Sequence, residues 1–248
     1  MRLTRTVMTM PAVIEIVDSR VSASDIEKIF TYWASVDDRF STFKPASEVS
    51  HYNASHIPPD ALSPELQEVL RLSAETKLAT KGFFDIQRDE KIDPSGLVKG
   101  WAIERGAQLF RHAGFKNFYL EISGDIQVDG HDAREQPWRI GIRHPFDKEK
   151  IIKVVQLSNH GVATSGTYER GQHIYNPLTK RPASPDIVSL TVIGSNIFEA
   201  DRFATAAFAM GRSGINFIEQ RPDLEGYMID ATGTATMTSG WNSFVITS

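Results

Sequence analysis

The sequence contains no cysteine and no apolar run long enough to cross a membrane. The absence of cysteine excludes disulfides, thiolate-bound zinc, cysteine nucleophiles and a lipid anchor on cysteine. Any chemistry that the chain performs therefore uses oxygen and nitrogen atoms. The N-terminal residues also lack the apolar core of a signal peptide, so the sequence as given predicts a cytoplasmic protein, or a periplasmic or exported one if a leader has been removed.

An excess of basic residues is also missing. The 27 Lys and Arg residues are outnumbered by 31 Asp and Glu residues, and the seven histidines are scattered without the spacing of a metal finger. Nucleic acid is therefore not a predicted partner. The chain has 248 residues, 41% of them hydrophobic, which is enough for a large core. Its Pro, Gly and Ser clusters are too short to be linkers, so we expect a single domain over residues 1–248.

Strand-like and helix-like segments are mixed without strict alternation, which predicts an α+β fold with mixed or antiparallel sheets and packed helices. The clearest expectations are a strand over Val7–Val17, a helix over Ala23–Ser35 and a second helix over Leu62–Thr80. In the second helix Ser63 is the expected cap, and Leu66, Val69, Leu70, Leu72 and Leu78 are the expected inward residues. A final strand over residues 243–247 is expected to close a sheet edge.

The stretch from Ile92 to Arg105 combines charge, backbone freedom and a helix start. Asp93 precedes a proline, which disfavours helical geometry there, and Ser95 is a good N-cap for a helix that runs toward His112. The N–H groups at the helix start suit a phosphate, and Gly96 and Gly100 allow close approach of a ligand or a neighbouring backbone. The same pattern also fits an ordinary structural turn between a strand and a helix.

A second polar pair lies about a hundred residues further along the chain. Asp201 and Thr205 are one turn apart on an Ala-rich helix within residues 199–211. A carboxylate and a hydroxyl placed in this way can hold a hard cation such as Mg²⁺. The alternative interpretation is that Asp201 caps the start of the helix.

Three further side chains are candidates for ligand contact. Phe43 lies in a polar loop, where its ring could stack on a planar ligand or pack against a satellite of the core. Asp85 follows a short apolar run, and only seven residues separate it from Asp93. We therefore expect these two carboxylates to lie at one site.

Taken in order, these motifs resemble the FAD:protein FMN transferase (ApbE) family, and the resemblance covers nearly the whole chain. The matching segments are Met8, Ser41-Thr42-Phe43 with Ser47-Glu48 and Asn53, Phe84-Asp85, Asp93-Pro94-Ser95-Gly96-Leu97-Val98-Lys99-Gly100, Gly124-Asp125, Thr164-Ser165-Gly166-Thr167-Tyr168-Glu169-Arg170, His173-Ile174-Tyr175-Asn176-Pro177, and Asp201 through Thr205 to Gly211.

This resemblance implies a T-fold-like α+β domain that binds FAD and, with Mg²⁺, transfers the FMN half to a threonine hydroxyl of an acceptor flavoprotein, releasing AMP. Positions that contact FAD in the family are matched by Met8, Phe43, Phe83, Phe84, Asp85, Asp93, Lys99 and Tyr175. The implied metal ligands are the Gly96 carbonyl, Asp201 and Thr205, with the Ala204 carbonyl as a further candidate.

The implied catalytic residues are His173, which matches the proposed proton acceptor of the family, and Asp201 with its metal. A histidine is suited to that role because its ordinary pKa is close to physiological pH, although a histidine that only bonds a loop backbone would look the same. The sequence departs from the family pattern at Ser123, where the first glycine of Gly-Gly-Asp is usual, and at Asn176, where aspartate is usual. Phe43 stands where many members carry tyrosine.

Two other functions fit the same residues. An FAD pyrophosphatase needs the same cation and diphosphate site, but water replaces the threonine hydroxyl and the products are FMN and AMP. A flavin carrier without catalysis would bind FAD whether or not Mg²⁺ and His173 are present. Neither function requires a membrane span or a nucleic acid.

Overall fold

An eight-stranded antiparallel sheet forms the centre of the molecule. The computed structural model of the chain describes residues 1–167, 175–183 and 186–246. The strands of the sheet, in spatial order, are β1 (Arg2–Val7), β2 (Met10–Ile16), β5 (Phe118–Ile122), β6 (Asp125–Asp129), β9 (His160–Gly166), β12 (Ile187–Gly194), β13 (Leu224–Asp230) and β14 (Ala235–Met237). Each described neighbouring pair is antiparallel. The α+β prediction with antiparallel sheets is thereby confirmed.

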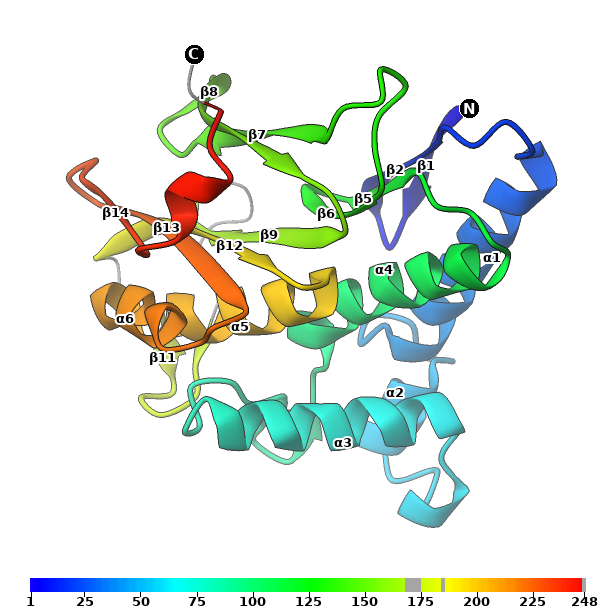
Figure 1. Cartoon of the computed structure of the whole chain (residues 1–248). Helices are drawn as coiled ribbons and strands as arrows, with labels where there is room; N and C mark the ends of the chain where they lie inside the picture. Colours follow the sequence, from blue (N-terminus) through cyan, green and yellow to red (C-terminus); the bar gives the residue numbers. More distant parts are fainter. Residues whose placement is uncertain (168–174, 184–185, 247–248) are drawn as a thin grey trace.

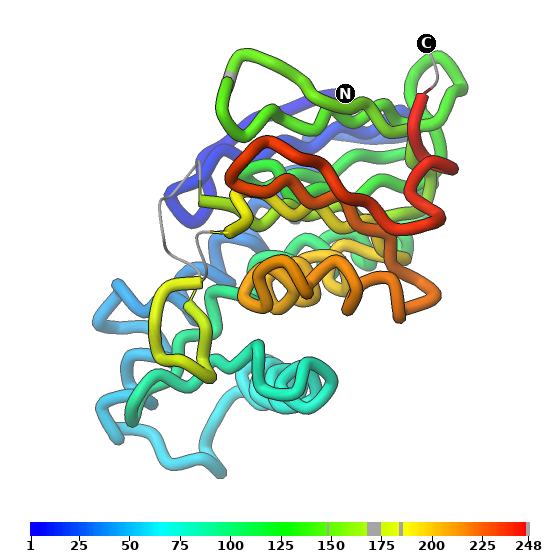
Figure 2. The backbone as a smooth tube through the Cα atoms, turned by 90° about the vertical axis from the view of Figure 1, so that its left-hand side faces the viewer, coloured from blue at the N-terminus to red at the C-terminus, as the bar shows by residue number. Residues whose placement is uncertain are grey.

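Six α-helices are described, and most of them lie on one side of the sheet, as Figure 1 shows. They are α1 (Ala23–Phe40), α2 (Glu48–Asn53), α3 (Pro64–Ala79), α4 (Ser95–His112), α5 (Ile197–Ala209) and α6 (Gly214–Glu219), with 3-10 turns η1 (Pro59–Ala61), η2 (Gly211–Ser213) and η3 (Trp241–Ser243). Helices α4 and α5 pack against each other directly below the sheet, and α3 packs on the far side of α4. Figure 2 shows the same layers from the side.

Three short two-stranded sheets complete the fold. They are β3 (Gln87–Arg88) with β4 (Lys91–Ile92), β10 (Tyr175–Asn176) with β11 (Arg181–Pro182), and β7 (Trp138–His144) with β8 (Asp147–Leu157). The β7–β8 hairpin lies above the large sheet, on the face opposite the helices. It therefore gives the sheet a second covered face.

Both faces of the sheet are packed, and successive side chains along a strand point to opposite faces. On β5, Phe118, Leu120 and Ile122 are buried toward the helices and belong to the larger core. On the other face, Ile126 and Val128 of β6 belong to a smaller core with residues of β7 and β8. The rigid sheet thus holds α4 and α5 below and the hairpin above.

The strand expected over Val7–Val17 corresponds to β2, and a further strand that was not expected, β1, precedes it and forms a hairpin with it. The turn between β1 and β2 is made by Met8 and Thr9, whose φ angles of 52° and 62° lie in the left-handed region. Such turns normally carry Asn or Gly, so neither residue gave a turn signal. A β-branched residue with positive φ is strained, which often marks a functional site.

Several other expected boundaries were wrong. Helix α1 continues to Phe40, five residues beyond its expected end. Leu78 of α3 is 83% exposed, because it lies twelve residues after the buried Leu66 and is rotated by roughly 120° around the helix. The sheet edge is formed by β14, whereas Val245 makes only an isolated bridge to Val155 of β8.

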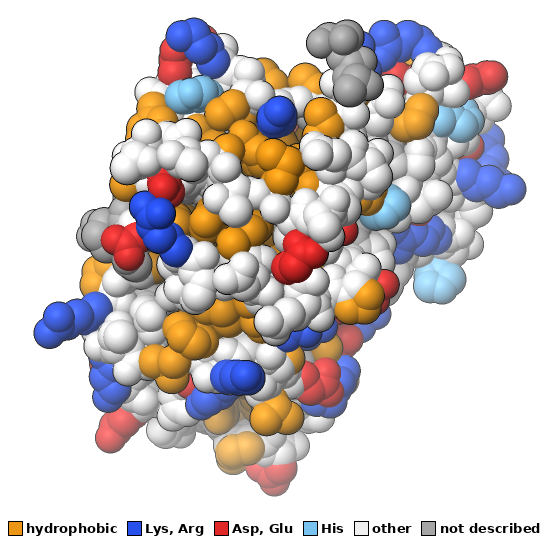
Figure 3. Space-filling view, turned by 60° about the vertical axis from the view of Figure 1, so that its left-hand side comes forward, with side chains coloured by type: hydrophobic (Ala, Val, Ile, Leu, Met, Phe, Trp, Pro, Cys, Tyr) orange, Lys and Arg blue, Asp and Glu red, His pale blue; other side chains and the backbone are white. Residues whose placement is uncertain are grey.

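The surface is mixed in character. On the face drawn in Figure 3, apolar side chains gather in the middle and charged side chains lie mainly around the margin. None of the described helices has both the length and the apolar character that crossing a membrane requires.

Candidate active-site cleft

A cleft of about 750 Å³ opens where the β1–β2 turn, the loop after α1, the start of α4 and the middle of α5 meet. Its walls also include the end of β9 and residues on both sides of the β3–β4 hairpin. Its lining residues include Met8, Thr9, Phe43, Phe83, Phe84, Asp85, Arg88, Asp93, Gly96, Lys99, Ser123, Thr164, Ser165, Tyr175, Asp201 and Thr205. A cavity of this volume is in the range of small-molecule sites.

The two segments that the sequence singled out meet at one wall of this cleft. The Gly100 amide donates to Asp201 Oδ2 at 2.8 Å, which joins α4 to α5. A Cβ atom on Gly100 would lie 2.7 Å from the Asp201 Cβ, so only glycine allows this approach. One turn away, a Cβ on Gly96 would lie 3.6 Å from Thr205 Cγ2. The backbone of α4 thus faces the polar side chains of α5 over one helical turn.

Asp201 is not a helix cap. The N-cap of α5 is Asn196, whose side chain accepts a hydrogen bond from the Glu199 amide. Asp201 lies in the second turn of the helix and is 6% exposed. The capping interpretation of this carboxylate is therefore wrong.

Buried charges surround Asp201. Asp125, 2% exposed, is a charged neighbour of Asp201, and the Lys99 ammonium forms an ion pair with Asp125. Burial and the negative charge of Asp125 raise the pKa of Asp201 well above its usual range, while Lys99 and the Gly100 amide act in the opposite direction. Two carboxylates and one ammonium leave an excess of negative charge. The site is thus electrostatically suited to a cation.

The entry to α4 is held by side chains outside the helix. Pro94 occupies the N-cap position and Ser95 is the first helical residue, so the expected Ser95 cap was wrong by one position. The Asp93 carboxylate accepts from the Ser95 amide at 3.2 Å, and supplies the missing cap contact. The Asn53 side-chain amide donates to the Ile92 carbonyl and accepts from the Ile92 amide, both at 2.8 Å, and so fixes the residue before Asp93.

Aromatic rings line the cleft at different depths. Phe84 is buried, Phe83 is half-buried, and Phe43 is 94% exposed at the mouth. The exposure of Phe43 rules out the alternative in which it packs on the core. The Arg88 guanidinium lies 5.0 Å from the centre of the Tyr175 ring. A planar ligand in the cleft would therefore meet the apolar surfaces of these aromatic rings and the cationic surface of Arg88.

Asp85 lines the cleft together with Asp93, as expected from their spacing. Its Oδ2 atom forms an ion pair of 2.6 Å with Lys77 Nζ, and its Oδ1 atom accepts from the Gln87 amide. The carboxylate is thus oriented by two neighbours.

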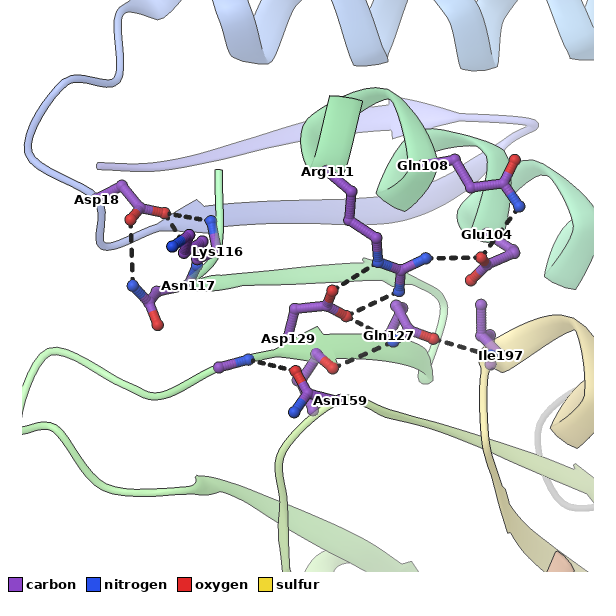
Figure 4. A network of polar contacts seen from close by, with 12 residues as sticks. Asp18, Glu104, Gln108, Arg111, Lys116, Asn117, Gln127, Asp129, Asn159 and Ile197 are labelled. Carbon is purple, nitrogen blue, oxygen red and sulfur yellow. Dashed lines mark hydrogen bonds and ion pairs between the residues drawn. The ribbon is translucent and has the colours of Figure 1, made fainter. Parts of the chain in front are cut away.

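A polar network behind the cleft connects the two helices (Figure 4). Gln127 of β6 accepts a hydrogen bond from the Ile197 amide at the start of α5 and donates to Asp129. Asp129 accepts from Arg111 near the end of α4 at 2.6 and 2.8 Å, and Arg111 also donates to Glu104. The start of α5 and the end of α4 are therefore held by one continuous set of contacts through β6.

The structure brings nearly all predicted site residues together, although their roles remain predictions. The predicted flavin contacts that line the cleft are Met8, Phe43, Phe83, Phe84, Asp85, Asp93, Lys99 and Tyr175, and the predicted metal ligands that line it are Gly96, Asp201 and Thr205. The Ala204 side chain is buried and does not line the cleft. His173 lies outside the described residues.

Two charged residues at or beside the cleft were not predicted. Asp125 follows the Ser123-Gly124 turn and carries the charge next to Asp201, and the Gly-Asp pair was its only sequence signal. Arg88 lies on the two-residue strand β3, which is too short to predict. The described residues contain no group of three or more His, Cys, Asp or Glu side chains that could hold a metal. Any cation here would therefore depend on carbonyl and hydroxyl oxygens beside Asp201.

The family model that matches this chain is that of the ApbE family, over residues 6–90 and 87–228. Proteins named FAD:protein FMN transferase from Salmonella typhimurium and Escherichia coli K12 are 30% and 31% identical to it over 154 and 159 residues. These matches cover 58% and 60% of this chain but only 44% and 45% of the relatives, so the chain spans less than half their length. The protein of that name from Vibrio cholerae is 25% identical, covering 79% of this chain and 75% of the relative.

Solved structures share the fold. The flavin transferase ApbE from Vibrio cholerae superimposes with a TM-score of 0.87 at 23% identity, covering 98% of each chain. The ApbE protein from Thermotoga maritima also gives a TM-score of 0.87, at 21% identity, covering 100% of this chain and 99% of that one. Because the family model covers most of the sequence, this chain belongs to the ApbE family.

Proposed function

We propose that this protein transfers the FMN moiety of FAD to a threonine hydroxyl of an acceptor flavoprotein. The threonine oxygen attacks the FMN-side phosphorus of the pyrophosphate and forms a phosphodiester bond. The bond from that phosphorus to the bridging oxygen breaks, and the oxygen leaves with AMP. The hydroxyl proton passes to a base, for which we propose His173.

Family membership and the convergence of α4 and α5 support this proposal. The relatives are named FAD:protein FMN transferase, and the cleft combines aromatic walls with a charged end, as a flavin dinucleotide requires. The single observation that carries the proposal is the 2.8 Å contact from the Gly100 amide to Asp201, because it joins the second turn of α4 to a buried carboxylate of α5. His173 is two residues before Tyr175, which lines the cleft.

A divalent cation fits the residues at this end of the cleft. Asp201 and Asp125 are both buried, and the Lys99 ammonium offsets only one of their two negative charges. We propose that Asp201, Thr205 and the Gly96 carbonyl, with the Ala204 carbonyl as a further ligand, hold Mg²⁺. A bound Mg²⁺ would offset negative charge on the diphosphate and the departing AMP. The protein's own residues orient the phosphates through the α4 amides and Lys99.

The direct test is to incubate the protein with FAD, Mg²⁺ and a threonine-bearing flavoprotein, and to measure the acceptor mass and free nucleotides. Covalent FMN on the acceptor with release of AMP is the expected result. Free FMN and AMP with an unmodified acceptor would instead establish an FAD pyrophosphatase. FAD binding that yields no product and is indifferent to Mg²⁺ and to His173→Ala would establish a carrier.

We also propose that residues 1–248 work as one domain, because the cleft is built from segments between Met8 and Thr205. Limited proteolysis should then release no shorter fragment that retains FAD binding. A stable shorter fragment that binds FAD would contradict this organisation.

A further inference from the structure

Arg88 lines the cleft, and no role for it was predicted from the sequence. It lies on the first strand of the β3–β4 hairpin, and both ends of this hairpin are held by hydrogen bonds. At the base, the Asp93 amide donates to the Ile86 carbonyl at 2.7 Å. On β4, the Asn53 side chain bonds both backbone groups of Ile92. The backbone that carries Arg88 is therefore fixed beside the cleft.

The described lining residues include three basic side chains, and two of them are held by carboxylates. The Lys44 ammonium lies 2.5 Å from an oxygen of Asp37 and 2.7 Å from an oxygen of Asp38. The Lys99 ammonium forms an ion pair with the buried Asp125. The charges of both lysines are thus offset by the protein itself.

Arg88, the third basic residue, is held less closely. Its Nη1 atom lies 3.9 Å from Asp93 Oδ2, which is beyond hydrogen-bond distance, and its side chain is 47% exposed. A guanidinium has five N–H donors in a fixed fork that matches two oxygens of one anion. Among the described lining cations, Arg88 is therefore the one that can bind a ligand anion without breaking a close ion pair.

Two neighbours favour an anion at this position. The centre of the Tyr175 ring lies 5.0 Å from the Arg88 guanidinium carbon, so the ring restricts the orientations of the cation. Lys91 stands directly opposite Arg88 in the pairing of β3 with β4. Like charges at directly opposed positions repel each other, and a bound anion would offset that repulsion.

The position of Arg88 indicates which anion it meets. One oxygen of Asp93 accepts a hydrogen bond from the Ser95 amide at the start of α4, and the other oxygen faces Arg88. The guanidinium and the first amides of α4 are therefore neighbours of the same carboxylate. Phosphate oxygens bound at the start of α4 would lie within reach of the Arg88 side chain.

From this geometry we infer that Arg88 binds the diphosphate of FAD, with the Tyr175 ring holding the guanidinium in place. This inference rests on the proposed function, because it adds one contact to the diphosphate that the transfer cleaves. When the bond from the FMN-side phosphorus to the bridging oxygen breaks, negative charge grows on the departing AMP. Arg88 offsets part of that charge beside Lys99 and the α4 amides.

The test compares two ligands that each share one part of FAD. ADP carries the diphosphate, whereas riboflavin carries the flavin ring without phosphate. The affinity of the full chain for each ligand is measured by calorimetry in the presence of Mg²⁺. Arg88→Gln should weaken ADP binding about tenfold and leave riboflavin binding unchanged. Arg88→Lys should give an intermediate affinity for ADP, because it keeps the charge but loses the planar fork.

Lys91→Gln is the matched control. It removes the same charge from the paired strand of the same hairpin, but Lys91 does not line the cleft. Its affinity for ADP should stay within about twofold of the parent value. Unchanged ADP binding in Arg88→Gln, equal losses in Arg88→Gln and Lys91→Gln, or an equal loss of ADP and riboflavin binding would each overturn the contact.

In the transfer reaction, Arg88→Gln should raise the KM for FAD and lower kcat, while the melting temperature stays at the parent value. Failure of the proposed function would look different. If the parent chain only hydrolyses FAD while Arg88→Gln still weakens ADP binding selectively, the transferase proposal is wrong and the diphosphate contact stands. If Arg88→Gln transfers FMN with the KM and kcat of the parent chain, the transferase proposal holds and the contact is wrong.

Discussion

Gly100 and Gly96 are one helical turn apart on α4, but only Gly96 has space for an added Cβ atom. A Cβ on Gly100 would meet the Asp201 Cβ at 2.7 Å and the Ile197 carbonyl oxygen at 3.1 Å, whereas a Cβ on Gly96 meets nothing closer than 3.4 Å. We expect Gly100→Ala to push α5 away and to cost about 1–3 kcal/mol of stability. Gly96→Ala should be neutral or slightly stabilising, because alanine favours helix and keeps the carbonyl.

Thermal unfolding and Mg²⁺ titration of the two alanine variants would test this contrast. Gly100→Ala should lose both stability and the response to Mg²⁺, and Gly96→Ala should keep both. Comparable behaviour of the two variants would mean that the close approach at Gly100 does not position Asp201.

Asp201 is expected to oppose stability in the absence of metal, because its carboxylate is buried beside Asp125 and its pKa is raised. Asp201→Asn removes that charge and can still accept the Gly100 hydrogen bond. At neutral pH in EDTA the variant should melt roughly 2–4 °C higher, an effect on the order of 1 kcal/mol. Mg²⁺ should stabilise the parent chain, as proposed, and should have no effect on this variant. A lower melting temperature in EDTA would show that the charge of Asp201 supports the fold.

At the scale of elements, Gln127 connects β6 to the start of α5 through the Ile197 amide. Gln127→Met keeps the volume but leaves that amide and the Asp129–Arg111 pair without one partner each. We expect a loss of about 1–3 kcal/mol in urea unfolding, because buried polar groups become unsatisfied. Gln136→Met, at an exposed position, is the control and should change stability by less than about 0.5 kcal/mol. Equal effects of the two substitutions would show that the Gln127 network does not stabilise the fold.

The helices were predictable because their signals are local. Ser63 and Pro64 start α3, and the apolar spacing of Ile26, Ile29 and Trp33 marks α1. The β1–β2 turn was missed because Met8 and Thr9 adopt positive φ without turn residues. That conformation is imposed by the pairing of the flanking strands, which short-range patterns do not contain.

The candidate site was predictable for a different reason. Asp201 and Thr205 share a helix face by spacing alone, but their distance from Gly96 and Gly100 depended on how α4 and α5 pack. The family resemblance supplied that long-range information. Asp125 was missed as a charge neighbour of Asp201, because its role arises only where β6 meets both helices.

The order of the strands in the large sheet could not be predicted from the sequence either. β6 pairs with β9, while the intervening β7 and β8 leave the sheet and cover its upper face. The apolar pattern of a strand shows which face is buried but not which strand lies beside it, so pairing partners could not be assigned from the sequence. The cover that this hairpin gives to the sheet therefore could not be predicted.

For the whole molecule, the buried carboxylates predict how stability depends on pH. Burial raises the pKa values of Asp201 and Glu104, so the metal-free folded state binds more protons than the unfolded state between about pH 4 and 7. Stability should therefore fall as pH rises through that window. Asp18 has the opposite effect, because hydrogen bonds from residues 116 and 117 outweigh its burial and lower its pKa. Its contribution is present above about pH 4 and is lost as pH falls further.

Together these opposed effects place the most stable pH of the metal-free protein on the acidic side of neutrality. Melting temperatures in EDTA between pH 3 and 8, at constant ionic strength, would measure the profile. Asp201→Asn should flatten the decline between pH 5 and 7, whereas Asp18→Asn should reduce the loss of stability below pH 4. Excess Mg²⁺ should move the optimum upward, because the cation competes with the proton for Asp201. A profile that rises from pH 5 to 7 in EDTA and is unchanged in Asp201→Asn would show that this carboxylate does not control the balance.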